Sequence, residues 1–198
     1  MPARKTPPEA WVGAALAALA DGGPEAIRIE VLAASLGVTK GGFYGEFADR
    51  GALVERMLDT WEQTVVDDVI SQIENTEDDA HTKLRHLFEL ARRHTRAGRG
   101  LAVELAVRDW ARRNPSVNKR LNRVDNRRMA YLRKLFRQIG CGHEDAEARS
   151  FLTFSLFVGS NLITAEHDGR SRRDVISDAV DSLLTTADTD PARDRDNR

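Results

Sequence analysis

The sequence predicts an all-α protein in which an N-terminal three-helix helix-turn-helix domain is joined to a helical C-terminal domain. Three observations lead to this prediction. Apolar residues recur at the three- and four-residue spacing of amphipathic helices. No segment shows the sustained period-two alternation of a strand. Capping residues and glycine or proline breaks separate the apolar stretches. A chain of 198 residues is long enough for two such domains.

The first predicted helix opens with a capping box. Thr6 can cap it, Pro7 suits its first position, and Glu9 can return a hydrogen bond to the cap. Trp11 belongs to its apolar face, and the run Asp-Gly-Gly-Pro at 21–24 ends it.

Two short segments around a tight break follow, which is typical of a helix-turn-helix. The second helix is expected from Ile29, and Gly37 suits the left-handed residue that ends a helix. Thr39 can cap a short third helix, the element that would enter the major groove of DNA. Asp49 can cap a fourth helix, whose apolar face continues to Val65.

The remaining helices are separated by weaker breaks, beginning with a loop at 75–79. The segment 148–163 is apolar on nearly all sides, so we expect it to be buried on both faces, in part by another subunit. A second capping box, Ser171 to Asp174, opens the last helix. The helices predicted for this part lie around 84–91, 101–110, 117–139, 148–163 and 175–184.

These patterns predict three regions. A helix-turn-helix domain is expected at 6–55 and a helical effector-binding and dimerisation domain at 56–186. The polar tail 187–198 is expected to be disordered.

Composition excludes several classes of protein. No apolar run reaches the roughly 18 residues of a membrane span, and the N-terminus lacks the apolar region of a secretory signal. Cys141 is the only cysteine, so no intrachain disulfide or cysteine-based metal cluster can form, and we interpret it as a small loop residue. We therefore expect a cytoplasmic protein with no membrane partner.

An enzyme is not predicted. His143, Glu144 and Asp145 are adjacent on a helix and would not face one site, while carboxylates at a helix start are expected from the helix dipole. We expect no catalytic residue, no cofactor and no metal.

Residues 10–61 combine several features at fixed spacing. They are the alanine-rich first helix ending near Gly23, then Leu32-Ala33, Leu36 to Gly41, Phe43-Tyr44 with Phe47, and Asp49-Arg50 with Ala52-Leu53. This combination resembles the N-terminal DNA-binding domain of the TetR family of transcriptional regulators; the C-terminal part resembles the family only in kind. The resemblance implies a ligand-responsive regulator of transcription, in particular a homodimeric repressor that binds a near-palindromic operator on double-stranded DNA and is released by a small molecule.

Three positions depart from the family pattern. Members usually carry an aromatic or basic residue at Gly45 and histidine at Glu46. Glu46 adds negative charge beside the DNA face, so we expect an altered contact there, or a side chain turned toward an arginine. Arg28 stands where a capping Ser or Thr is usual, and it could replace a hydroxyl contact with a charged one.

The resemblance places DNA contacts around the third helix. Lys40 can donate to guanine O6 or N7, and the Thr39 methyl can meet a thymine methyl. The two glycines that follow each cost a helix about 1 kcal/mol relative to alanine, and they either admit the backbone close to DNA or pack against the first helix. The predicted DNA-binding residues are Arg28, Thr39, Lys40, Gly41, Gly42, Tyr44 and Arg50.

Tyr44 and Arg50 are expected to contact the DNA backbone. The Tyr44 hydroxyl can reach a phosphate, although the residue could equally be a half-buried core aromatic. Arg50 begins a helix, where the dipole also favours phosphate; the alternative is a solvated arginine.

Charge is distributed unevenly. The formal net charge is −1, and residues 1–60 hold six basic and eight acidic side chains, so DNA affinity would depend on their placement and on dimerisation. Residues 108–137 instead contain eleven Lys or Arg and two Asp. This stretch could bind nucleic acid or an anionic effector, but we favour a solvated helix face paired with the acidic residues at 74–79 and 144–147.

The C-terminal domain is expected to bind the effector and a second subunit. Dimer contact is predicted through the last two helices, at 146–166 and 171–186. A helical scaffold that has lost DNA binding is the alternative function, favoured by Glu46 and by the acidic N-terminal count. Candidate effector-binding residues, each of which could instead be plain core, are Phe88, Trp110, Met129, Tyr131 and Phe154.

Overall fold

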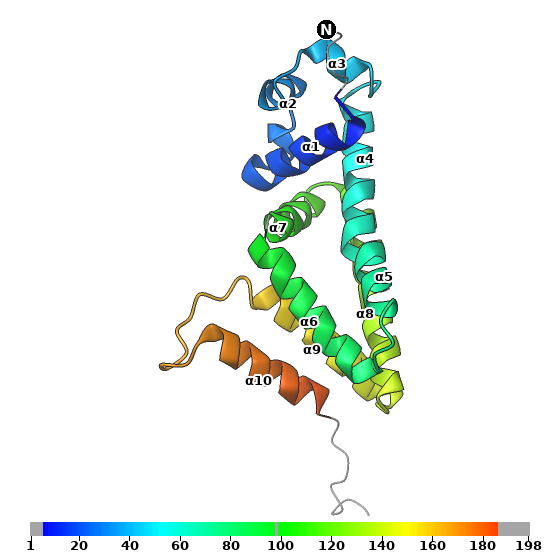
Figure 1. Ribbon diagram of the computed structural model, residues 1–198, viewed down its shortest axis with the longest axis vertical. Helices are drawn as coiled ribbons and strands as arrows, with labels where there is room; N and C mark the ends of the chain where they lie inside the picture. Colours follow the sequence, from blue (N-terminus) through cyan, green and yellow to red (C-terminus); the bar gives the residue numbers. More distant parts are fainter. Residues whose placement is uncertain (1–5, 98, 186–198) are drawn as a thin grey trace, which may run out of the picture. The chain divides into compact units, whose positions relative to one another are not determined.

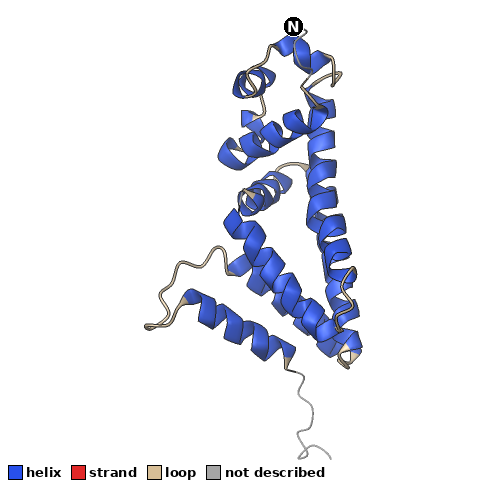
Figure 2. Ribbon diagram, in the orientation of Figure 1, coloured by secondary structure: helices blue, strands red, loops and turns tan. Residues whose placement is uncertain are grey.

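The computed structural model describes residues 6–97 and 99–185, and within these ranges it contains helices and no strand (Figure 2). The predicted all-α fold is confirmed. The predicted tail 187–198 lies outside the described residues. The helices that the structure describes include none with the length and apolar content of a membrane span. The elements are α1 (Pro8–Gly22), η1 (Pro24–Ala26), α2 (Ile29–Ser35), α3 (Lys40–Tyr44), α4 (Arg50–Glu62), η2 (Gln63–Asp68), α5 (Val69–Glu74), α6 (Ala80–Ala97), α7 (Gly100–Ala111), α8 (Pro115–Gln138), α9 (His143–Gly159) and α10 (Arg172–Leu184) (Figure 1).

Two of the predicted helix caps are confirmed. The Asp49 carboxylate accepts a hydrogen bond from the Ala52 amide at 2.8 Å, and the Ser171 hydroxyl accepts one from the Asp174 amide at 3.1 Å. Thr39 occupies the cap position of α3, but its side chain makes no capping hydrogen bond.

The prediction for the first helix was wrong by one position. Helix α1 begins at Pro8, and Pro7 precedes it with φ −69° and ψ 153°, in the extended region, so Thr6 does not cap the helix. The reason is local: the ring of Pro8 disfavours helical backbone at the residue before it.

The turn between α2 and α3 has the predicted geometry. Gly37 has φ +67°, the left-handed region that glycine adopts without a steric penalty. The Val38 amide donates to the Ala33 carbonyl at 2.9 Å and closes the turn. This break sets the direction in which α3 leaves α2.

The described residues form two compact units. The first contains residues up to 72 together with 92–128, and the second contains 73–91 and the residues from 129 onward. The first unit therefore includes α7 and much of α8 along with the helix-turn-helix, and its core contains Trp11, Phe43, Leu53 and Val107. The two units do not divide at the predicted boundary between residues 55 and 56. That boundary, between DNA binding on one side and effector binding and dimerisation on the other, stays a prediction.

A π-helix interrupts the helical run that begins at Arg50. Helix α4 continues without a break into η2, a π-helical segment, and then into α5, which ends before the predicted loop at 75–79. The sequence predicted one regular helix here and missed the π-helix. π-Helical segments are rare in proteins, and those that occur often lie at functional sites.

Helix α9 ends at Gly159, before the predicted Ile163. The Ser160 hydroxyl and the side-chain amide of Asn161 both donate to the Phe157 carbonyl. Such side-chain bonds compete with the backbone hydrogen bonds that would continue the helix. The predicted burial on both faces is not found in the isolated chain, where Phe151 is 64% exposed.

Candidate DNA interface

An aromatic cluster in the first unit fixes helix α3. The Phe43 ring is fully buried and packs edge-on against Trp11, with ring centroids 5.3 Å apart. The Phe47 ring stacks on Phe43, with ring centroids 5.5 Å apart. Phe43 and Phe47 are thus core residues, as predicted. Their neighbour Tyr44 is 60% exposed, so its hydroxyl is accessible to a phosphate.

All the predicted DNA-binding residues are exposed. They lie at the start of α2, along α3 and at the start of α4, elements that pack in one unit with α1 (Figure 1). The exposed residues are Arg28, Thr39, Lys40, Gly41, Gly42, Tyr44 and Arg50. An accessible surface of this kind, on a helix-turn-helix, is what a DNA duplex requires.

Arg50 has a structural role that the sequence did not indicate. Its Nε donates to the Ile27 carbonyl at 2.7 Å, and one Nη donates to the Pro24 carbonyl at 2.6 Å. The guanidinium therefore ties the start of α4 to the segment before α2. An arginine has five N–H donors, so its other Nη can still donate to a phosphate.

Lys40 is paired within the protein. Its ammonium lies 2.5 Å from the carboxylate of Glu30 on α2. The hydrogen bond from Lys40 is the main reason that the pKa of Glu30 lies below its usual value. Sequence reasoning missed Glu30, because no local spacing relates two residues that lie ten positions apart across a turn.

The space around Gly41 and Gly42 does not require glycine. A Cβ at Gly42 would meet Trp11 at 3.9 Å, and one at Gly41 would meet the Thr39 hydroxyl at 3.6 Å, both ordinary contacts. Tight packing against α1 therefore does not explain them. Close approach of the α3 backbone to DNA remains the explanation that we favour.

We expect Gly41→Ala to separate stability from DNA binding. The change should raise the free energy of unfolding by up to about 1 kcal/mol, yet weaken DNA binding because the added methyl separates the backbone from the groove. Gly13→Ala on α1, where a Cβ meets nothing within 4 Å, is the matched control and should leave binding unchanged. Thermal unfolding and DNA titration measure the two effects; unchanged binding by Gly41→Ala would contradict the close approach.

Glu46 extends only partly into solvent. The residue is half-buried, and one of its carboxylate oxygens is shielded from solvent. Its charge is therefore partly withdrawn from solvent, and the predicted contact with an arginine stays a prediction.

The basic stretch at 108–137 is largely paired, as we favoured, but mostly with other partners than expected. Within the described part of the chain, Arg133 with Glu147 and Lys134 with Glu74 follow the predicted pairing. The other paired residues contact acidic groups of the first unit. Across the stretch the paired cations are Arg108, Arg113, Arg120, Arg123, Arg127, Arg128, Arg133 and Lys134.

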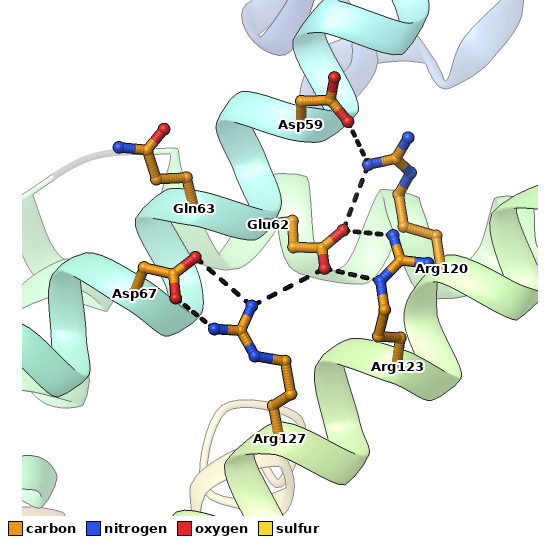
Figure 3. A pocket seen from close by; sticks show the side chains of 7 residues that line it. All are labelled: Asp59, Glu62, Gln63, Asp67, Arg120, Arg123 and Arg127. Atoms are coloured by element: carbon orange, nitrogen blue, oxygen red, sulfur yellow. Dashed lines mark hydrogen bonds and ion pairs between the residues drawn. The ribbon is translucent and has the colours of Figure 1, made fainter.

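Three of these arginines form a ladder between α8 and the α4–η2 run (Figure 3). Glu62 lies at its centre and accepts hydrogen bonds from Arg123 at 2.8 and 2.7 Å and from Arg120 at 3.2 Å. Arg120 also contacts Asp59 at 2.5 Å. Arg127 of α8 donates to the carboxylate of Asp67, which belongs to the π-helix η2. The carboxylates balance the guanidinium charges, so this part of the basic stretch offers little net attraction for an anion.

The signal for the ladder was present in the sequence. Residues 120, 123 and 127 share one helix face, as do the acidic residues 55, 59 and 62. What the sequence did not indicate is that these two faces meet.

A second charged network holds α7 against α8. Glu104 is only 5% exposed and accepts hydrogen bonds from Arg128 at 2.9 and 3.0 Å and from Arg108 at 2.9 Å. Arg108 in turn makes a bidentate pair with Asp125 at 2.9 and 2.7 Å. Two guanidiniums and two carboxylates thus satisfy one another.

The candidate effector residues do not share one compact unit. Trp110 packs against the core of the first unit, whereas the other candidates belong to the second. Tyr131 is buried, and burial together with the charge of Glu74 raises the pKa of its hydroxyl. Hydrogen bonds from Lys134 and Lys83 lower the pKa of Glu74 to about 2. Phe154 stacks on Phe157 at 6.3 Å.

The other titratable residues considered from the sequence, Cys141 and His143 to Asp145, lie where α8 ends and α9 begins. Cys141 is buried in the loop after α8, and burial raises the pKa of its thiol. His143, Glu144 and Asp145 form the first turn of α9. Within the described residues, no group of three or more His, Cys, Asp or Glu side chains is placed to bind a metal.

The fold and the exposed surface of α3 define a helix-turn-helix protein of the DNA-binding class. Residues 12–57 match the family described as "Bacterial regulatory proteins, tetR family". The N-terminal helices are therefore a tetR-family helix-turn-helix domain, and the resemblance stated from the sequence is confirmed. No curated protein matches the chain.

Solved structures of regulators share the fold over nearly the whole chain. The fatty acid degradation regulator FadR from Bacillus halodurans is 16% identical, with a TM-score of 0.67 over 93% of this chain and 98% of that chain. A transcriptional regulator from Rhodococcus sp. RHA1 is 20% identical, with a TM-score of 0.66 over 90% and 94%. A protein described as a TetR-family transcriptional regulator, from Mesorhizobium loti MAFF303099, is 18% identical, with a TM-score of 0.64 over 89% and 92%. At these identities the likeness shows the fold.

Proposed function

We propose that this protein is a homodimeric, ligand-responsive transcriptional repressor. Each subunit reads half of a near-palindromic operator, and a small molecule bound to the C-terminal domain releases the DNA. The observation that carries the proposal is the exposure of every predicted DNA-contact residue on a domain of the tetR family. The protein has no catalytic role in this proposal, and its place of action is the cytoplasm.

Dimerisation through the last two helices is supported by exposed apolar residues. Phe151 and Leu152 on α9 are 64% and 51% exposed, and Leu162 and Ile163 beyond it are 55% and 54% exposed. Arg149 donates to carbonyls at the end of α10 at 2.6 and 2.9 Å, which joins the two helices in one packed pair. Large apolar side chains exposed in this number favour a partner surface.

The effector is expected to act by changing the spacing of the recognition helices. Half-sites lie about 34–36 Å apart on one face of the duplex, so a dimer with another spacing loses one of its two contacts. A ligand can shift this equilibrium only if it prefers the non-binding state. Phe88, Met129, Tyr131 and Phe154 are the candidate contacts in the second unit, and Trp110 in the first. Crystals of free and ligand-bound protein with identical spacing would overturn this mechanism.

Binding-site selection from a random duplex library tests the proposal. A near-palindromic winner, with an affinity that falls steeply as salt rises, is the expected result. If the folded protein enriches no sequence, alone or with candidate effectors, the DNA-binding proposal fails and the scaffold function takes its place.

Lys40 and Arg50 should contribute to different parts of DNA binding. We expect Lys40→Ala to reduce the preference for the operator over random DNA about 5- to 100-fold, because a base contact is lost. Arg50→Ala should weaken binding to both DNAs alike, because phosphate contacts carry no sequence information.

Arg56→Ala, which removes an exposed charge from α4, is the matched control for both variants. Since Arg50 also bonds to two carbonyls, its variant should be tested below its own unfolding temperature. Equal effects of Lys40→Ala and Arg50→Ala on the two DNAs would refute the division.

A further inference from the structure

Lys40, the first residue of α3, and Glu30 of α2 form an ion pair that is open to solvent. Lys40 Nζ lies 2.5 Å from Glu30 Oε1, and the side chains are 54% and 61% exposed. Exposed pairs of this kind contribute little to stability. In a helix-turn-helix, the N-terminal residues of the second helix meet the base edges. Because the Glu30 carboxylate is paired with the Lys40 ammonium, it would lie at the same base edges.

We propose that Glu30 and Lys40 together read one G·C base pair in each half-site, with guanine facing Lys40 and cytosine facing Glu30. This inference rests on the proposed DNA-binding function and adds Glu30 as a specificity-determining residue.

The edge of a G·C pair is complementary to the ion pair. In the major groove, guanine presents N7 and O6 as acceptors and cytosine presents its N4 amino group as a donor. A Watson–Crick hydrogen bond joins O6 and N4, so these atoms lie about 2.9 Å apart. The ammonium and the carboxylate are 2.5 Å apart. The ammonium can therefore face O6 and N7 while the carboxylate accepts from N4.

The other base pairs match less well, in a definite order. With thymine facing Lys40, thymine O4 can still accept from the ammonium and adenine N6 can still donate to the carboxylate. Adenine N7 then faces the carboxylate, however, and the ammonium loses its second acceptor. With adenine facing Lys40, thymine O4 faces the carboxylate. With cytosine facing Lys40, its amino group faces the ammonium and guanine O6 faces the carboxylate. The expected order is thus G·C first, T·A second, and A·T and C·G last.

The test uses four duplexes that differ only at the base pair assigned to Lys40 in the selected site. The wild-type protein should bind the G·C duplex about tenfold or more tightly than the C·G duplex, within the usual range for a good base contact. Glu30→Ala should reduce this ratio to about threefold or less, and Glu30→Gln, which keeps an acceptor but not the charge, should fall between. The affinity of Glu30→Ala for random DNA should stay the same or rise, because a negative charge is removed.

Glu25→Ala is the matched control, since it removes the same charge from an exposed position on η1 and should leave the base preference at its wild-type value. Glu30 is exposed, so the thermal unfolding temperature should not change. If Glu30→Ala keeps the wild-type preference, or raises affinity equally for all four duplexes, Glu30 is not a reader and the inference is overturned. If the wild-type protein selects no site at all, the proposed DNA-binding function fails as well, an outcome distinct from the first.

Discussion

Phe151→Glu is expected to convert the proposed dimer to a monomer and to reduce affinity for the proposed operator by a hundredfold or more. Phe151 is the most exposed of the large apolar side chains in the described residues, and Leu152 is its exposed neighbour on α9. A charge placed in an apolar subunit contact must be desolvated there without a partner. The subunits should therefore separate in sedimentation velocity runs at micromolar concentration.

The effect on DNA follows from the loss of linked binding. When two reading heads belong to one particle, the second contact is intramolecular, and overall affinity exceeds that of one head by about 10²–10⁴-fold. A monomeric variant loses this factor for the full operator but keeps its affinity for an isolated half-site. Titrations of both duplexes distinguish lost dimerisation from lost DNA contact.

Asn126→Glu, which adds the same charge at an exposed position of α8, should remain dimeric and bind the operator as the wild type does. Because Phe151 is exposed in the subunit, its replacement should leave the helical circular dichroism spectrum unchanged. A Phe151→Glu protein that is still dimeric would place the subunit contact elsewhere.

Glu104→Ala is expected to lower the free energy of unfolding by about 3–5 kcal/mol, the cost typical of removing one partner from a buried ion pair. Glu104 is almost fully buried and accepts hydrogen bonds from Arg108 and Arg128. Without it, the Arg128 guanidinium loses two hydrogen bonds, at 2.9 and 3.0 Å, and keeps its ion pair with Asp125 at 3.5 Å. Urea denaturation measures the loss.

Glu55→Ala is the control, because Glu55 also bonds to an arginine but is 62% exposed. Exposed pairs contribute at most about 1 kcal/mol. Similar losses for Glu55→Ala and Glu104→Ala would show that burial does not decide the energy of these pairs.

The same residue predicts a pH dependence. Burial by itself raises the pKa of Glu104, but the hydrogen bonds and charges of Arg128 and Arg108 outweigh it and leave the pKa below the ordinary 4.5. A carboxyl group whose pKa is lower in the folded state stabilises the fold above its unfolded-state pKa and loses that contribution as the pH falls through the folded-state value. The free energy of unfolding of the wild type should therefore decrease below about pH 4.5. Glu104→Gln should have a lower free energy of unfolding at neutral pH and should lose less of it as the pH falls.

Helix positions were predicted well, because the signals for them are local. The caps at Asp49 and Ser171 and the left-handed Gly37 each act on backbone groups only a few residues away. The same locality explains the misses: Thr6 was assigned as a cap without considering the effect of Pro8 on Pro7, and no short-range pattern indicated the π-helix.

The residues proposed from the sequence for DNA contact are all exposed in the structure, but the partners of their side chains could not be predicted. Tyr44 and Lys40 are exposed on α3 because Phe43 and Trp11 occupy the buried side of that helix. That Lys40 contacts Glu30, and that Arg50 contacts two carbonyls near η1, depends on how the helices cross.

The helical class, the turn between α2 and α3 and the family of the N-terminal domain could be inferred from the sequence, because residue spacing and caps are local features of the chain. Which charges meet depends instead on how the helices pack. From the sequence, the basic stretch could bind an anion or pair with the acidic residues at 74–79 and 144–147, whereas in the structure Arg120, Arg123 and Arg127 lie against carboxylates some sixty positions earlier in the chain. Since a charge acts through the groups that surround it in space, its role could be assigned only once the fold had placed those groups beside it.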